Sequence, residues 1–400
     1  MITNKYHKII TVSYEDSGYL YFENISDQIG WLYPRLVRDQ NSANKPNCEY
    51  SLNGVDWHTL DFNVWPYHVS YTAWGNSVLP GVMVPAHARI YLRGVNQQWS
   101  TNPYGGPGFL MSVPYILGGN LLSLIDYNNM DSITTIPYMK AETTGPFAGD
   151  NNLISAEKMH FGNATTAANG SLYGMFSGCK SLVKGPDMSK ITTIDNDGCN
   201  KMFNGCTSLT TAPDLSSVTT VGSSGMQSML KGCTILANVP DMSSITTITG
   251  ESQFRYMFQD CKAITTGPDM SGITVGQRSF INGMFSGCNS LVTPPDLSNL
   301  TNGPMEGARD MFRGCTALTK GLDFKNITAN VSDSFMSAMY ESCYNIEEMT
   351  YPNISTWVDT WTGFGNNIGR DVAGTKTFYA PTGLVIPDGG IPTGWTRVDY

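Results

Sequence analysis

Charged residues are scarce in this chain of 400 residues. Lys and Arg together number 24 and Asp and Glu 33, which is 14% of the sequence and gives a net charge of −9. An average soluble domain has about 25% charged residues. Because phosphate recognition needs clustered Lys and Arg, this balance argues against a nucleic-acid partner. Uncharged polar residues supply the polarity instead, which is typical of proteins that work outside a cell or on the surface of a particle.

Long apolar runs are also missing. No stretch of 18 apolar residues occurs, so we expect no membrane insertion. The opening residues, MITNKYHKIITVSYEDSGYL, have a polar start and an apolar core of only four residues. A secretion signal needs a longer apolar core, so we expect none here.

Catalytic signatures are the third absence. The sequence contains no G-x-S-x-G, H-E-x-x-H, G-x-G-x-x-G or P-loop motif. It has no C-x-x-C, and no His follows residue 160, so we expect neither a zinc site nor a cofactor. These absences predict a protein that is not an enzyme, although a facing pair of carboxylates in the N-terminal part stays open.

A repeat dominates the second half of the chain. Segments such as MFSGCKSLVKGPDMS and MFNGCTSLTTAPDLS recur every 27 or 28 residues. They begin at Met175, Met202, Met229, Met257, Met284, Met311 and Met339, and a weaker copy begins at Pro146. Self-similarity at this period indicates units that cannot bury their apolar faces alone and must therefore stack.

Each repeat has apolar residues at spacings of three and four around its Met, as Leu172, Met175, Phe176 and Cys179 show. This spacing predicts one face of a short helix. Glycine precedes most of the Cys residues and predicts a left-handed helix stop. An apolar column headed by Leu182 then opens a short strand, and a second β-like segment follows a Pro-Asp corner.

Seven Cys residues form one column of the repeat. Stacked side chains point in parallel and not at one another, so we interpret the column as a structural ladder of free, buried thiols and not as disulfides. Its members are Cys179, Cys206, Cys233, Cys261, Cys288, Cys315 and Cys343. The remaining two, Cys48 and Cys199, lie outside the column.

The Asp of the corner has two interpretations. A row of carboxylates could bind Ca²⁺. A Ser follows two residues after each Asp, as in Asp187 and Ser189, and this spacing favours an Asx turn within each repeat. Thr pairs such as Thr192-Thr193 form a further row, which suits a strand and leaves open a flat hydroxyl surface.

The M-F-x-G-C-x-S-L-x-x-x-P-D-x-S pattern resembles the BspA-like leucine-rich repeat family over roughly residues 118–400. The resemblance implies a surface adhesion or binding protein of Bacteroidetes, or a virion protein of phages that infect them, and no enzymatic activity. It also implies an extended recognition surface. The expected lack of a secretion signal departs from the bacterial surface type and favours the phage interpretation.

The expected fold is mainly β with short helical turns: an N-terminal antiparallel β-sandwich followed by a leucine-rich-repeat-type solenoid of about eight coils. We divide the chain into a sandwich of immunoglobulin or jelly-roll kind (1–117), an N-terminal cap with a degenerate first repeat (118–170), the repeats (171–350) and a C-terminal cap (351–400). Asn53-Gly54 indicates a hairpin. The Gly- and Pro-rich stretch 101–119 is interpreted as a linker.

The aromatic cluster of Trp65, Tyr67, Tyr71 and Trp74 is the candidate ligand site. Exposed rings stack on sugars and anchor protein interfaces. In a sandwich, alternating aromatic residues also fill the core or the seam between domains. All three interpretations stay open at this point.

The preferred function is that of a phage virion component on the virion surface: a fibre, decoration or receptor-binding protein. Its N-terminal domain would contact capsid or tail proteins, its solenoid would bind a host surface protein or glycan, and homo-oligomers are possible. The first alternative is a bacterial cell-surface or extracellular adhesin. The second is a carbohydrate-active enzyme or a carbohydrate-binding module.

Overall fold

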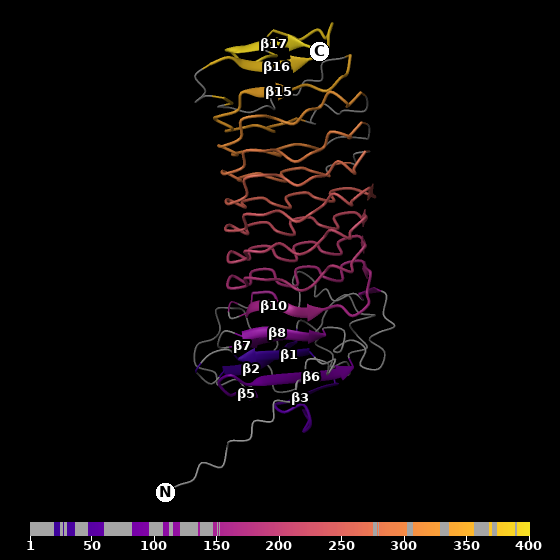
Figure 1. The fold of residues 1–400 in the computed structure, drawn as a ribbon, viewed down its shortest axis with the longest axis vertical. Coiled ribbons are helices and arrows are strands. Elements are labelled where there is room, and N and C mark those ends of the chain that lie inside the picture. Colours follow the sequence, from indigo (N-terminus) through magenta and orange to yellow (C-terminus); the bar gives the residue numbers. More distant parts are fainter. Residues whose placement is uncertain are drawn as a thin grey trace.

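The computed structural model describes residues 20–24, 27, 30–36, 47–59, 82–95, 107–111, 115–120, 135–136, 147–149, 151, 153–274, 278, 280–301, 307–328, 336–355, 368–369, 374–388 and 390–400. Within these ranges the protein is mainly β, with strands β1 to β17 in several sheets and no helix. The repeats lie one above another along the long axis, between the N-terminal strands and β15 to β17 (Figure 1).

The segment around each repeated Met is a run of overlapping turns. The Met175 amide donates to Leu172 O at 3.2 Å, whereas the next amide, that of Phe176, donates to Met202 O in the following repeat at 2.8 Å. Successive amides thus donate in turn to a carbonyl three residues back and to a carbonyl of the neighbouring repeat. In an α-helix every amide donates within its own helix, so the bonds to the neighbouring repeat exclude one. The prediction of short helical turns is therefore wrong in the described repeats.

Left-handed residues recur every four positions in these segments. Gly170, Gly174 and Gly178 have φ of 64°, 58° and 76°. The Gly before Cys is left-handed, as predicted, and Asp260 and Ser342, which replace it in two repeats, are left-handed as well, with φ of 61° and 62°. The regular reversal keeps every third or fourth side chain on the inner side, which is the spacing that a helix would also give.

The inner side of the turn segments is a dry core. Met175, Phe176, Cys179 and Leu182 are fully buried, and so are their counterparts in the other six repeats. The rings of one column stack face to face along the axis, with centroids 5.6 Å apart between Phe147 and Phe176 and 5.5 Å apart between Phe176 and Phe203. Leu230 interrupts this column, which resumes from Phe258 to Tyr340. Stacking of this kind adds to the area buried between coils.

A parallel sheet of two-residue strands forms a second side of the stack. Its order is β14-β13-β12-β11-β9, and neighbouring strands pair Thr with Thr, as in Thr193↔Thr220. The strands are β9 (Thr135–Ile136), β11 (Thr166–Ala167), β12 (Thr193–Ile194), β13 (Thr220–Val221) and β14 (Thr247–Ile248). The second residue of β11 to β14 is buried and the Thr is not, so the core face and the outer face alternate as a strand requires.

The third side consists of longer strands at its two ends and isolated bridges between them. At the N-terminal end β10 (Leu153–His160) is followed by the bridges Ser155↔Lys184 and Lys184↔Thr211. At the C-terminal end Lys320 bridges Glu348 of β15 (Glu348–Thr350), which pairs in parallel with β16 (Lys376–Ala380), itself paired with β17 (Trp395–Asp399). Trp395 is buried there.

The N-terminal strands join the stack through β10, which pairs in parallel with β8 (Tyr115–Asn120). The resulting sheet has the order β10-β8-β1-β6-β3-β4 and is otherwise antiparallel. Its other strands are β1 (Leu20–Asn24), β3 (Asn47–Ser51), β4 (His58–Thr59) and β6 (Arg89–Val95). The linker predicted over 101–119 is wrong where it is described, because β8 and β7 (Pro107–Met111) lie in it.

A second antiparallel sheet has the order β5-β2-β7, with β5 (Val82–Val84) and β2 (Gly30–Leu36) beside β7. The buried Asn24 at the end of β1 connects the two sheets, because its amide donates to Val84 O at 3.2 Å and to Pro85 O at 3.1 Å. The Asn53-Gly54 signal falls in the β3–β4 hairpin, whose loop is longer than the two residues that this signal favours.

Candidate functional site

The predicted aromatic site, Trp65, Tyr67, Tyr71 and Trp74, lies outside the described residues. Its role as a partner or glycan interface therefore stays a prediction. The structure does describe the repeats, where four sets of side chains form rows along the long axis. These are the Cys residues, the Asp residues of the corners, the Thr residues and the charged residues of the turn segments.

The Cys row lies inside the stack. Each of its seven thiols donates to a main-chain carbonyl in the preceding repeat, at sulfur–oxygen distances of 3.0 to 3.3 Å. The acceptor is Phe in six cases and Leu230 in the other, and it directly follows the Met of its repeat except at Phe147, which follows Pro146 in the weaker first copy. Every thiol of the row is directed along the axis at an oxygen, and none of the seven is in a disulfide bond; nor is Cys199.

Burial makes these thiols poor nucleophiles. Loss of solvation raises the pKa of Cys261 and of Cys343 to about 12. The same cause raises the pKa of Cys199, Cys206, Cys233, Cys288 and Cys315. Because only the thiolate reacts and binds metals, these raised pKa values make the thiols unreactive at neutral pH. Their hydrogen bonds instead link neighbouring coils.

The Asp row lies on the outside and forms the predicted Asx turns. Oδ1 of Asp241 accepts the Ser243 amide at 2.9 Å and the Ser243 hydroxyl at 2.7 Å. These bonds, the amide first, lower the pKa of Asp241, and the bonds from Ser271 do the same for Asp269. The other corners are built alike. Each carboxylate therefore already serves its own repeat.

Thr side chains add links between repeats. The Thr219 hydroxyl donates to Thr192 O at 3.3 Å, and Thr210 and Thr301 donate to carbonyls of the preceding repeat in the same way. The proton of each of these hydroxyls thus points along the axis, and the hydroxyl oxygen can still accept a hydrogen bond. The outer Thr face is a polar surface of the sheet.

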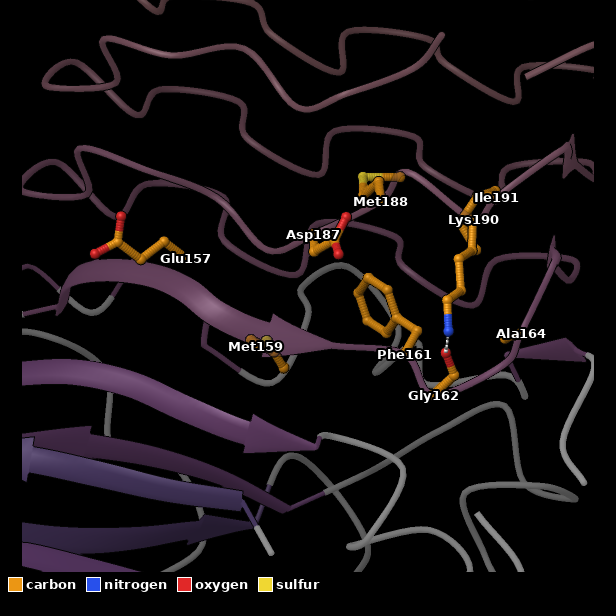
Figure 2. A pocket seen from close by; sticks show the side chains of 9 residues that line it. All are labelled: Glu157, Met159, Phe161, Gly162, Ala164, Asp187, Met188, Lys190 and Ile191. Atoms are coloured by element: carbon orange, nitrogen blue, oxygen red, sulfur yellow. Dashed lines mark hydrogen bonds between the residues drawn. The ribbon is translucent and has the colours of Figure 1, made fainter. Parts of the chain in front are cut away.

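A small pocket of about 220 Å³ lies between β10 and the first complete repeat (Figure 2). Its charged side chains already have partners: Glu157 is bonded to Lys184 at 2.8 Å, and Lys190 donates to Gly162 O at 3.2 Å. Asp187 accepts the Ser189 amide. The remaining lining is largely apolar and includes Phe161 and Met159. This pocket has no side chain free for acid–base work among those that line it.

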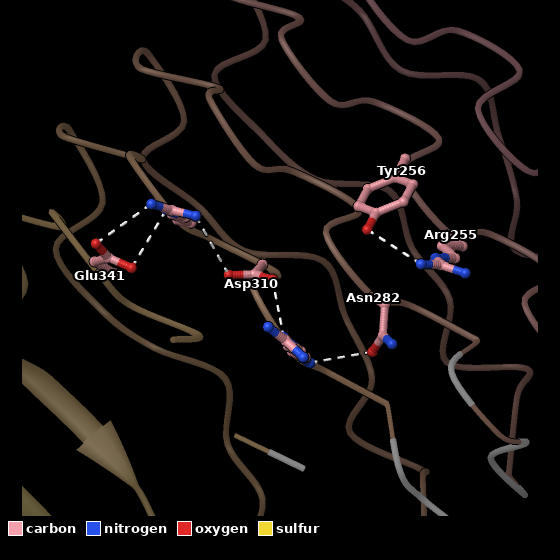
Figure 3. Close-up of polar contacts among 7 residues, drawn as sticks. Arg255, Tyr256, Asn282, Asp310 and Glu341 are labelled. Carbon is pink, nitrogen blue, oxygen red and sulfur yellow. Dashed lines mark hydrogen bonds and ion pairs between the residues drawn. The ribbon is translucent and has the colours of Figure 1, made fainter. Parts of the chain in front are cut away.

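Charged residues on the outside of the turn segments form a surface that the sequence analysis did not identify (Figure 3). Arg309 and Arg313 contact Asp310, and Arg313 also contacts Glu341 of the next repeat at 3.3 Å. Arg255 stacks on the ring of Tyr256. The signal available in the sequence was the column two places before each Met, which holds a polar residue or Tyr in every repeat and contains Arg255 and Arg309.

Two searches of the described residues bear on ligand and membrane binding. No group of three or more His, Cys, Asp or Glu side chains there is placed to hold a metal ion. In the same residues no helix has the length and apolar character to cross a membrane.

Comparisons with known proteins found one distant structural likeness and no match to a family or a curated protein. No family model matches the chain, and no curated protein matches it. Among solved structures, the chain is similar to a leucine-rich repeat protein from Bacteroides ovatus ATCC 8483, with 14% identity and a TM-score of 0.32, over 67% of this chain and 76% of the other. That likeness is too distant to assign a family, so the BspA-like resemblance stays a prediction.

Proposed function

We propose that this chain is a non-enzymatic recognition protein of a phage virion: a fibre, decoration or receptor-binding component. In this proposal a solenoid of about eight coils is displayed outward, and the N-terminal strands, completed as a β-sandwich, dock on capsid or tail proteins. The ligand is a protein or glycan of the host surface.

The observation that supports this proposal is the way the repeats use their side chains. Apolar residues and thiols face inward and are fully buried, and they bond coil to coil. Corner carboxylates serve their own turns. Such a stack is rigid and elongated, and its outer rows repeat at the strand spacing of roughly 4.8 Å. An extended polymer or a broad protein surface can be recognised by rows of this kind.

The same observation supports a bacterial cell-surface adhesin, so the experiment must separate the two. Purified virions and host envelopes from the source culture are analysed by mass spectrometry and by immunogold labelling with an antibody to this chain. We expect peptides and gold on the virions. Signal on the envelopes alone would replace the virion proposal with the adhesin, and signal on neither would refute both.

A further inference from the structure

The charged surface of the turn segments has two different halves. Toward the C-terminal end its cations are neutralised: Arg309 lies 3.3 Å from Asp310, and Arg313 lies 3.3 Å from Glu341 (Figure 3). Arg255, two repeats before Arg309, and Lys231, three repeats before Arg313, have no carboxylate within 4.0 Å among the described residues. These two cations are therefore not held in ion pairs, and their charges are open to a ligand, on a protein whose net charge is −9.

Both free cations gather on one aromatic ring. The guanidinium carbon of Arg255 lies 4.9 Å from the centroid of the Tyr256 ring, and Lys231 Nζ lies 5.7 Å from it. A guanidinium nitrogen of Arg255 also bonds the Tyr256 hydroxyl at 3.3 Å. Arg255 Nε is enclosed and has no acceptor in the described structure. The fold thus gains no hydrogen bond from this nitrogen, and the ring fixes the position of the guanidinium.

Tyr256 occupies a position that does not suit it. Its φ is +57°, a left-handed conformation that is unusual for a bulky residue. The residue at this position is left-handed in all seven repeats, and the others are Gly174, Lys201, Ser228, Gly283, Asp310 and Ala338, so Tyr256 is the one aromatic residue among them. The repeat that follows leaves room for the ring, because a Cβ on Gly283 would lie 2.3 Å from Tyr256 Cδ1. A strained aromatic residue with space kept beside it points to function, since packing alone would favour a smaller residue.

We propose that Lys231, Arg255 and Tyr256 form a binding site for an acidic sugar unit of a surface polysaccharide. This inference rests on the proposed function and names the ligand class. The two cations give charge-assisted hydrogen bonds to a carboxylate or sulfate group, and the ring offers apolar contact to the sugar. Lys201 and Tyr173, in earlier repeats, form a similar pair, with Lys201 Nζ 3.0 Å from the tyrosine hydroxyl.

The charge pattern favours a sparsely charged polymer. Acidic residues lie in the same turn segments as the cations, namely Asp197, Glu251 and Asp260. They would repel a ligand with a phosphate at every unit, such as a nucleic acid. A polysaccharide with an acidic group on only some of its sugars can bind with that group beside Lys231 and Arg255. Its neutral sugars then lie beside the acidic residues of the protein.

The test measures the affinity of the full chain for carboxymethyl dextran with an acidic group on only some of its sugars, for polygalacturonate and for uncharged dextran, by calorimetry at low and high salt. We expect binding to the sparsely charged carboxymethyl dextran, weakened by salt, weaker binding to polygalacturonate, and none to dextran. Arg255→Gln and Lys231→Gln should each weaken binding about tenfold. Arg313→Gln is the matched control on the same surface, and its affinity should stay within about twofold because Arg313 is already paired. Equal losses in all three variants, or no binding by the wild type, would overturn the site.

Tyr256→Gly separates binding from folding. It removes both the ring and the left-handed strain, so we expect a melting temperature that is unchanged or higher together with about tenfold weaker binding. A lower melting temperature with unchanged affinity would show that Tyr256 is structural. A pull-down of the chain with host envelopes distinguishes failure of the site from failure of the recognition function. If the envelopes retain Arg255→Gln as well as they retain the wild type, the site is wrong and the recognition function stands. If the wild type is not retained, the recognition function fails, and the polymer titration still decides the site.

Discussion

The Cys206 thiol donates a hydrogen bond to the Phe176 carbonyl of the preceding repeat, 30 residues earlier, at 3.1 Å. The same oxygen accepts the Cys179 amide of its own repeat at 3.0 Å. A carbonyl has two lone pairs, and each accepts one of these two donors inside the core. The Cys row therefore completes the hydrogen bonding of the turn segments at the same time as it links neighbouring coils.

Replacing Cys206 with Ala should lower the free energy of unfolding by about 1 kcal/mol more than replacing Cys199 with Ala. Both side chains are fully buried, so each substitution removes a sulfur atom from the core. The Cys199 thiol has no hydrogen bond in the described structure, which makes this variant the matched control. Urea unfolding of both variants and the wild type gives the difference. Equal losses would mean that the thiol–carbonyl bond adds nothing to stability.

Alkaline pH should destabilise the protein through its buried thiols. Their contribution is constant below about pH 8, because a thiol in an unfolded chain ionises near 8.5. Between there and the folded pKa of about 12 for Cys261, the unfolded state has released a proton that the folded state keeps. The free energy of unfolding then falls as pH rises, by up to ~1.4 kcal/mol per pH unit for each such thiol.

Urea unfolding at pH 7, 9 and 10 measures this slope. The Cys261→Ala variant is the control, because it keeps the other ionisable groups and lacks one thiol. Its stability should fall less steeply with pH than that of the wild type. Identical slopes would show that Cys261 is ionised to the same extent in both states.

Left-handed positions in the turn segments should respond to single methyl groups. Gly205 has a φ of 76°, and a Cβ there would lie 3.8 Å from its nearest neighbour, so there is space for it. Gly205→Ala should therefore lower the free energy of unfolding by about 1–2 kcal/mol through the backbone alone. The reverse change, Ala338→Gly at a φ of 50°, should raise it by a smaller amount. Thermal melts of the two variants check this opposition in sign.

The sequence predicted the columns of the repeat but not the conformation that carries them. Inward residues such as Leu172, Met175, Phe176 and Cys179 have the spacing of a helix, and a chain of turns reversed every four residues has the same spacing. The distinguishing signal was the column that holds Gly170, Asp197 and Ser224, since these residue types tolerate left-handed φ. The Gly and Pro content of 101–119 predicted a linker, but strand pairing on a sheet can override such a composition, as it does in β7 and β8.

The candidate site on the turn segments could not be predicted from the sequence. Tyr256 and Lys231 are 25 positions apart, and only the stacking of repeats brings their side chains together. The absence of a carboxylate near Arg255 is likewise a property of the three-dimensional neighbourhood, because Glu251 and Asp260 are close in sequence. The Asx turns were predictable because Asp and Ser lie two residues apart in the same turn.

Deleting one internal repeat tests the stacked arrangement directly. Removal of residues 202–228 joins Lys201 to Met229, and it preserves every column because both repeats begin at Met. Each coil contacts only its neighbours, so the shortened stack should keep its fold and lose no more than about 5 °C in melting temperature.

The matched comparison is truncation after Thr350, which removes β16 and β17 and uncovers the buried Met349. An uncapped end exposes a full coil interface to water, so this variant should lose more than about 10 °C or aggregate, although the missing segment has no repeat motif. Circular dichroism melts rank the two variants. If the internal deletion is the more damaging, the repeats depend on contacts beyond their neighbours, and the nearest-neighbour account of the stack is wrong.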